Sequence, residues 1–189
     1  MVFFNGSYTA ITQLNWQPAQ PLKVGLALGY SFYPDNTVNL SGSTGSALAR
    51  QPFDSAATAA LRLGIQGDWQ ISDRIVLAAW VGYVNAQARS GPLTGNEADI
   101  WNWSANVGIR DLGKKGSLLA IATGMAPRVT AIEGRAPDPE TAHLLEVFYE
   151  IPLTDNLFLT PGGFIVFLGG SGGNNDDIWV FLLRTSFRI

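Results

Sequence analysis

Residues 57–70 read ATAALRLGIQGDWQ, and in this stretch the odd and even positions differ in chemical character. The odd positions hold alanine, leucine, isoleucine, tryptophan and one glycine, whereas the even positions include Arg62, Gln66 and Asp68. Successive side chains of a β-strand point to opposite faces of a sheet. The stretch therefore predicts a strand with one apolar face and one polar face.

The same alternation recurs along the chain, for example in 22–33, 100–110 and 142–151. Turn-forming residues separate these segments, and no long segment has helical periodicity. The sequence predicts about nine strands, at roughly 3–16, 22–33, 57–71, 75–89, 99–111, 117–126, 141–152, 157–168 and 177–189. The fold class expected is all-β: one antiparallel meander that forms a single domain over residues 1–189.

A soluble β-sandwich has the same alternation, so other features must decide the environment. The predicted strands are long enough for the roughly 9–11 residues that a tilted transmembrane strand needs. Short connections at 18–21, 72–74, 113–116 and 154–156 alternate with long ones at 34–55, 90–98, 127–140 and 169–176. Aromatic residues lie near the ends of the apolar faces, as in the girdles of outer-membrane barrels: Trp16, Trp69, Trp101, Trp103, Tyr149, Trp179 and Phe187. These features favour a transmembrane β-barrel over a sandwich.

Composition excludes several classes of protein. Charged residues make up 14% of the chain, against about 25% in a typical soluble domain. The chain has no cysteine, which excludes disulfides and thiolate metal sites, and its net charge of −3 gives no case for nucleic-acid binding. No apolar run approaches the roughly 20 residues of a transmembrane helix.

Three stretches resemble a known family. Residues 142–149, AHLLEVFY, lead through the TDN of 154–156 to the TPG of 160–162. The stretch 111–116 reads DLGKKG, and the acidic NNDD of 174–177 precedes the LRTSF of 183–187. Together these motifs resemble the late hairpin, a periplasmic turn and the closing strand of cyanobacterial outer-membrane porins of the carbohydrate-selective, OprB-type family. The resemblance covers most of 99–189 and, more loosely, 7–90.

The resemblance implies a passive channel in the cell outer membrane for small hydrophilic solutes, either carbohydrates or inorganic ions including iron. It implies outer-membrane lipid as surroundings, a possible homotrimer, no cofactor, and N-terminal parts such as a signal peptide and a surface-layer-homology domain. Bacterial single-chain barrels close with an even number of strands. The expectation is therefore that this chain supplies the last nine of about sixteen strands.

The polar faces of the predicted strands supply the candidate pore-lining residues, since selectivity in a porin depends on lumenal width and charge. They are Arg62, Gln66, Asp68, Asn102, Asn106, Arg110, Glu146, Glu150, Arg184 and Arg188. The alternative is that such residues form ion pairs that brace the wall, for example Arg184 with Glu146 across one intervening strand.

Two other segments leave alternatives open. The longest loop, 34–55, either folds inward as a constriction or lies on the surface as a solvated loop, which is the commoner case for loops. Asn174–Asp177 lacks the spacing and closing glutamate of a calcium-binding loop, so no metal is expected. His143, the single histidine, is expected at the membrane interface rather than in a metal or catalytic site.

Enzyme activity is not expected. No G-x-S-x-G or phosphate-binding glycine motif is present. Glu146 and Glu150 lie two same-face positions apart on one strand, whereas paired catalytic carboxylates usually come from different strands. The competing functions are a porin, a structural barrel that anchors the envelope, and a soluble all-β binding module.

Overall fold

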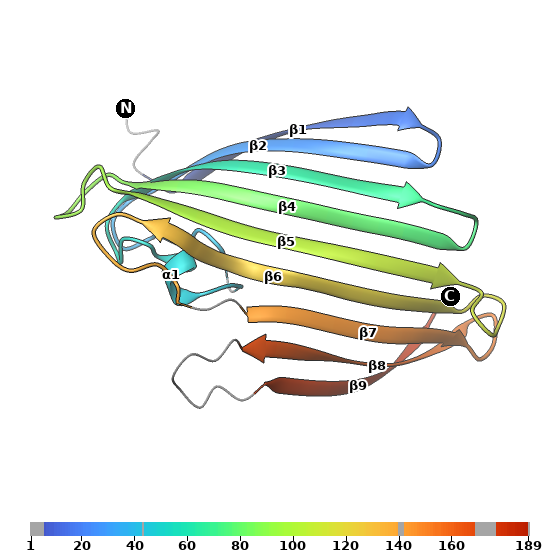
Figure 1. Cartoon of the computed structure of the whole chain (residues 1–189). Coiled ribbons are helices and arrows are strands. Elements are labelled where there is room, and N and C mark those ends of the chain that lie inside the picture. Colours follow the sequence, from blue (N-terminus) through green and yellow to red (C-terminus); the bar gives the residue numbers. More distant parts are fainter. Residues whose placement is uncertain (1–5, 43, 140–141, 169–176, 189) are drawn as a thin grey trace.

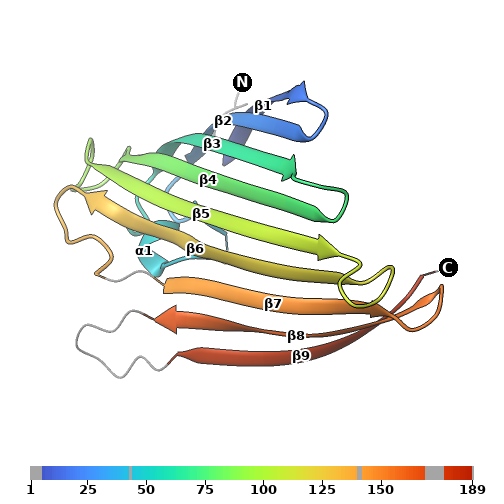
Figure 2. The same cartoon turned by 45° about the vertical axis from the view of Figure 1, so that its right-hand side comes forward.

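The computed structural model describes residues 6–42, 44–139, 142–168 and 177–188. They form one antiparallel sheet that is curved and open, with one concave and one convex face (Figures 1 and 2). Its strands are β1 (Tyr8–Ala19), β2 (Leu22–Tyr33), β3 (Thr58–Gln70), β4 (Ile75–Ala88), β5 (Glu97–Arg110), β6 (Leu118–Ile132), β7 (Ala142–Pro152), β8 (Leu157–Leu168) and β9 (Ile178–Phe187). The predicted all-β antiparallel meander is confirmed.

Each strand pairs with its neighbours in the chain, in the order β1 to β9. In the described part of the chain β1 and β9 are the two edges, and the sheet does not close on itself. Within the described residues, no helix has the length and apolar character needed to cross a membrane. Closure by further strands and a total near sixteen therefore stay predictions.

The pairing register places the polar-face positions of neighbouring strands side by side, and likewise the apolar-face positions, as the alternation predicted. Arg62 lies opposite Gly29 and Val84, while Leu63 lies opposite Leu28 and Tyr83. We call the face that carries Arg62 the inner face, because it is the concave one, and the opposite face the outer face. A shift of one residue would move every side chain to the other face, so this alternation fixes the register.

Two predicted strand boundaries were wrong, both at prolines. The first strand ends at Ala19 rather than at position 16, and a register shift after Trp16 accommodates Pro18. The sixth strand continues through Pro127 to Ile132, with register shifts in its pairing with β5. Its pairing with β7 stops at Met125, so the missing N–H of Pro127 interrupts no ladder on that side. Proline is tolerated at such edges and bulges. Residues 3–5 of the first predicted strand lie outside the described residues, and among the described ones this strand begins at Tyr8.

The connections are sorted as predicted. The turns after β1, β3, β5 and β7 lie at one end of the sheet, which we call the turn end (Figure 1). The longer connections after β2 and β4 lie at the other end, the loop end, where β6 and β8 also end. The β5–β6 turn is ordered by Asp111, whose side chain accepts a hydrogen bond of 2.6 Å from the backbone N–H of Gly116. Gly116 has φ of +82°, a conformation that favours glycine.

The loop between β2 and β3, residues 34–57, folds over the inner face, and we call it the inward loop. It contains the short helix α1 (Ala47–Arg50), which lies against β6 on the concave side of the sheet (Figures 1 and 2). Val38, Leu40 and Phe53 form a buried apolar cluster with inner-face residues of β3–β6, including Ile100 and Val129. Of the two alternatives, the solvated surface loop is therefore wrong and the inward fold is correct. The physical reason is that the loop has its own apolar side chains to bury.

Candidate functional site

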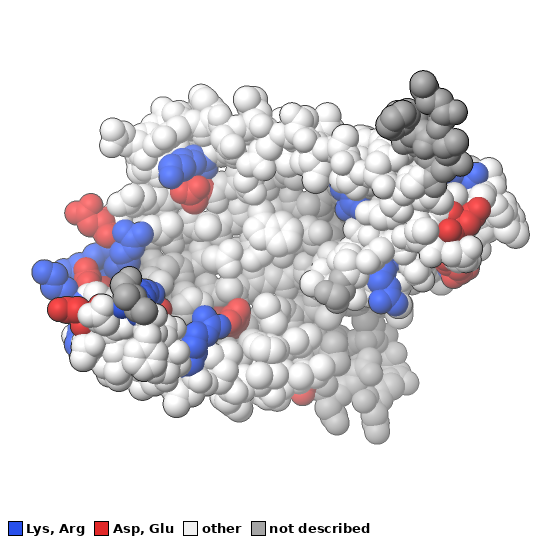
Figure 3. Space-filling model, turned by 180° about the vertical axis from the view of Figure 1, so that it is seen from behind, with Lys and Arg blue, Asp and Glu red and all other residues white. Residues whose placement is uncertain are grey.

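The inner face is hollowed, and basic and acidic side chains surround the hollow (Figure 3). The candidate residues on β3, β5, β7 and β9 all occupy this face by register, and Arg188 joins them through its contact with Glu150. The structure thus brings all ten to one surface: Arg62, Gln66, Asp68, Asn102, Asn106, Arg110, Glu146, Glu150, Arg184 and Arg188. Whether this surface lines a pore stays a prediction.

Three of the candidates lie in one row across the sheet. Asp68 is opposite Ala78, which is opposite Asn106; Asn106 is opposite Ala122, which is opposite Glu146. Because an alanine stands between each polar residue and the next, the longer side chains have room to reach into the hollow. The row presents two carboxylates and an amide at one height along the strands.

A second group lies at the turn end of the inner face. Nη2 of Arg188 lies 2.9 and 3.0 Å from the two carboxylate oxygens of Glu150. The guanidinium carbon of Arg188 also lies 3.9 Å from the centroid of the Phe158 ring, a cation–π contact. The bracing ion pair is therefore Glu150–Arg188, and in the described part of the chain Arg184 and Glu146 do not form the salt bridge suggested above. Arg184 lies opposite Thr160 on β8, nearer the turn end than Phe164, the β8 residue opposite Glu146.

Arg62 joins the sheet to the inward loop. Its Nη2 donates a hydrogen bond of 3.0 Å to the carbonyl oxygen of Leu40, and its Nε donates one of 3.3 Å to Oγ of Ser31. Asn102 lies beside Gly82, where a Cβ would come within 2.3 Å of its Oδ1. Arg62 therefore lies next to the inward loop, and Asn102 lies opposite Gly82 on the neighbouring strand.

The inward loop is fastened to the β6–β7 connection by side chains. Ser46 Oγ donates to Asp138 Oδ2 over 2.6 Å, and the same carboxylate oxygen accepts from the backbone N–H of Val129 over 2.7 Å. Further along the loop, Asp54 and Arg135 form a two-pronged salt bridge with distances of 2.7 and 3.2 Å. The hydrogen bond from Arg135 holds the pKa of Asp54 below its ordinary value. The loop is thus held by contacts between residues far apart in the sequence.

The outer face is apolar and exposed. Leu14 is 68% exposed and Phe181 82% exposed, although burial in a protein core is usual for such side chains. The predicted aromatic residues all occupy this face by register: Trp16, Trp69, Tyr149 and Phe187 toward the turn end, and Trp101, Trp103 and Trp179 toward the loop end. His143 also lies here, with its ring centroid 6.1 Å from that of Trp103. An exposed apolar face bounded by two aromatic rows is typical of a membrane-facing sheet.

Several inner-face residues are not among the ten predicted pore-lining candidates. Asn15, Lys23 and Trp80 occupy this face at the turn half of β1, β2 and β4. The residue types in β1 and β2 would have identified Asn15 and Lys23, since each alternates with apolar residues. Trp80 gave no such signal, because β4 is largely apolar on both faces.

The described residues contain no group of three or more histidine, cysteine, aspartate or glutamate side chains that could hold a metal ion. The 174–177 loop, apart from Asp177, lies outside the described residues. The candidates on the inner face are carboxylates, amides and guanidinium groups.

Comparison with known proteins shows the family to which the chain belongs. The model of the OprB family, described as carbohydrate-selective porins, matches residues 3–189. The chain is 35% identical over 202 residues to the uncharacterized protein sll0772 of Synechocystis sp., covering 97% of this chain and 37% of that protein. It is 27% identical over 204 residues to the uncharacterized protein alr4550 of Nostoc sp., covering 98% of this chain and 32% of that protein. The chain thus spans about a third of the length of these relatives. No solved structure is significantly similar to it. The family model covers nearly the whole sequence, and the sheet has one polar and one apolar face. The chain therefore belongs to the OprB family of carbohydrate-selective porins.

Proposed function

We propose that this chain forms part of the wall of a passive diffusion channel for small hydrophilic solutes in the outer membrane. The observation that carries the proposal is the difference between the two faces of the sheet. The inner face carries polar and charged side chains and, over an apolar patch, the inward loop, whereas the opposite face of the same strands is apolar and exposed. A water-filled lumen and a lipid exterior explain this division. The proposal assigns the chain no catalytic activity.

Closure of the barrel is part of the proposal. Lipid cannot satisfy the free N–H and C=O groups of a sheet edge, so a spanning sheet must close. β1 and β9 run in the same direction, because eight antiparallel pairings separate them. Antiparallel closure therefore needs an odd number of additional strands, and seven would give the sixteen of the porin size class. We propose that further strands of a longer polypeptide supply them, and that the full-length protein forms a homotrimer.

The charges of the inner face bear on the solute. On the described strands and at Arg188, the inner face carries five cations and three carboxylates: Lys23, Arg62, Arg110, Arg184 and Arg188 against Asp68, Glu146 and Glu150. Charge of this kind around a pore biases the passage of ions. The proposed solutes are carbohydrates and inorganic ions, including iron, with anionic forms favoured over bare cations.

The experiment that tests the channel is conductance of refolded full-length protein in planar bilayers. Discrete current steps in KCl are expected. A heat-modifiable gel mobility shift verifies that the barrel has folded. A folded barrel that gives no current steps would contradict the proposed function.

A further inference from the structure

One tryptophan departs from the distribution of the other five. Trp16, Trp69, Trp101, Trp103 and Trp179 occupy the outer face, whereas Trp80 lies on the inner face, opposite Gln66 on β3 and Ser104 on β5. It is 44% exposed. Contact with lipid does not explain an exposed aromatic ring on this face, so its position calls for another partner.

Small residues keep the space beside Trp80 open. The next inner-face position on β4 is Gly82, which is opposite Gly64, and the preceding one is Ala78. Trp80 and its neighbours line an open cavity of about 490 Å³, within the roughly 300–1,000 Å³ range of small-molecule sites. The cavity lies four residues along β3 from Arg62, or about 13 Å toward the turn end.

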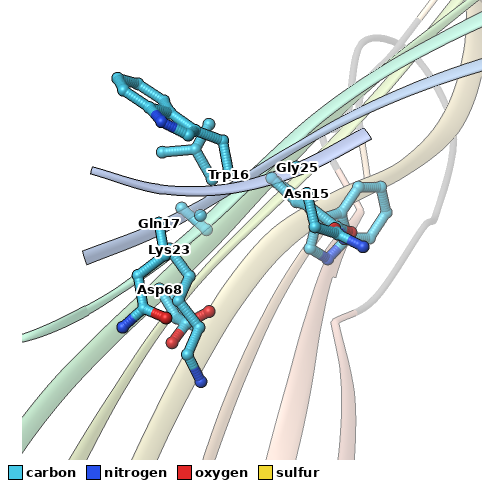
Figure 4. Close-up of a pocket in the computed structure, with 12 residues that line it drawn as sticks. Asn15, Trp16, Gln17, Lys23, Gly25 and Asp68 are labelled. Atoms are coloured by element: carbon cyan, nitrogen blue, oxygen red, sulfur yellow. The ribbon is translucent and has the colours of Figure 1, made fainter. Parts of the chain in front are cut away.

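Polar side chains surround the same cavity. Those of Gln17 and Asn15 are hydrogen-bonded, to the carbonyl oxygen of Gln20 and to Nε2 of Gln13. Gln66 reaches over Gly25, where a Cβ would lie 2.9 Å from its Cγ and Nε2 and 3.1 Å from Asn15 Oδ1. Among the described residues, the side chains of Gln66, Asp68 and Lys23 form no hydrogen bond or salt bridge with one another or with other groups. Lys23, Asp68 and Gln17 point to the cavity side of the ribbon and Trp16 to the other (Figure 4). The cavity thus offers free donors and acceptors.

We propose that this cavity is a binding subsite for neutral pyranosides, with Trp80 as the stacking platform. A pyranose ring has an apolar face of C–H groups that fits a flat aromatic ring, and hydroxyl groups at its edge that donate and accept hydrogen bonds. The carboxylate of Asp68 accepts, the ammonium of Lys23 donates, and the amide of Gln66 does both. The subsite rests on the proposed channel function. It adds a location for the sugar, on the turn-end side of the inward loop.

The charge of the cavity favours neutral over charged sugars. Lys23 and Asp68 contribute one cation and one anion and are opposite each other in the register of β2 and β3. Their charges offset one another, so a bound ion gains little net attraction. An uncharged polyhydroxylated ring uses both groups as hydrogen-bonding partners.

Sugar-induced block of the KCl current through the full-length protein tests the subsite. The probes are maltotriose, the open-chain sorbitol, which lacks a flat ring, and glucuronate, which carries a charge. For the wild type, half-block is expected at a lower concentration of maltotriose than of either other probe. The Trp80→Leu variant, which keeps an apolar side chain but not a flat one, is expected to raise the half-blocking maltotriose concentration about tenfold. Trp80→Phe retains most of the binding, and Trp69→Leu on the outer face is the matched control with unchanged block.

The outcomes separate the two proposals. If the folded wild-type protein gives no KCl current, the proposed channel function is contradicted. A conducting wild type overturns the subsite if maltotriose does not block it, if Trp80→Leu blocks as the wild type does, or if Trp69→Leu loses block to the same extent. Block by glucuronate equal to that by maltotriose overturns the preference for neutral sugars. If Trp80→Leu does not fold, Gln66→Ala replaces it, and wild-type block in that variant overturns the proposal.

Discussion

Ser46 and Asp138 are 92 residues apart in the chain, yet the hydroxyl of Ser46 donates a hydrogen bond of 2.6 Å to the carboxylate of Asp138. This bond joins the inward loop to the connection between β6 and β7. The same Ser46 oxygen caps α1 by accepting from the N–H of Ala49 over 2.9 Å. One side chain therefore orders the helix and fastens it to the wall.

Replacing Ser46 with alanine is expected to loosen the inward loop. A partly buried hydrogen bond to a carboxylate is worth about 1.5–3 kcal/mol, so the loop opens about tenfold more often or more. Limited trypsin digestion at Arg50 measures the opening, and Asp138→Asn is expected to act in the same direction. Thr44→Ala is the control, since among the described residues Thr44 bonds within the loop alone, to the carbonyl oxygen of Ser41. Equal cleavage of Ser46→Ala and the wild type would contradict this role.

Gly45 and Gly42 form a matched pair of sites in the same loop. Both have positive φ, of +84° and +66°, which costs a residue with a side chain about 1–2 kcal/mol. A Cβ on Gly45 would lie 2.3 Å from the carbonyl oxygen of Pro127, whereas one on Gly42 would have no neighbour within 4 Å. Gly45→Ala is therefore expected to increase tryptic cleavage at Arg50 more than Gly42→Ala does. The same increase in both variants would show that contact with Pro127 does not hold the loop.

Acid is expected to weaken the salt bridge between Asp54 and Arg135. The hydrogen bond from Arg135 lowers the pKa of Asp54 from its ordinary 3.8. The contribution of this pair is therefore fully present above about pH 3.8 and is lost as the pH falls through the lowered pKa. Asp54 is 76% exposed, so solvent limits the contribution to about 1 kcal/mol or less.

Carbon-13 NMR of the Asp54 carboxyl group measures this shift. A titration midpoint below 3.8 is expected in the wild type, and a return toward that value in Arg135→Gln. A midpoint that Arg135→Gln leaves in place would rule out the salt bridge as the cause.

The Glu150–Arg188 pair gives a prediction about ion selectivity. Glu150→Gln removes a negative charge from the inner face and frees Arg188, which keeps its contact with Phe158. The chloride-to-potassium permeability ratio of the full-length channel is expected to rise about twofold. Reversal potentials in a KCl gradient measure the ratio. Glu97→Gln is the control, because it makes the same charge change on the outer face, and an equal shift in both variants would contradict the assignment of faces.

The sequence predicted the strands and their faces because the two-residue alternation is a local signal. It misplaced strand ends at Pro18 and Pro127, where bulges accommodate residues that normally end a strand. The fold of the inward loop was left open because contacts such as Ser46–Asp138 depend on tertiary structure. The same loop obscured part of the alternation. Inner-face residues beneath it, such as Ala86 and Ile100, are apolar because the loop buries them, and this concealed the face on which Trp80 lies.

The central claim is that the two faces of this sheet meet different solvents, and cysteine scanning along β3 tests it most directly. The 189 residues contain no cysteine, so each thiol introduced into them is the only one in this part of the full-length protein, and the full-length protein without an introduced thiol gives the background labelling. Variants at positions 61, 63 and 65 of the outer face and 62, 64 and 66 of the inner face are made in the full-length protein in lipid vesicles. They are then treated with a charged, membrane-impermeant thiol reagent. Labelling with a period of two is predicted, with Arg62→Cys, Gly64→Cys and Gln66→Cys reacting and Leu61→Cys, Leu63→Cys and Ile65→Cys protected. Equal labelling of both sets, or protection of the inner set alone, would contradict the account.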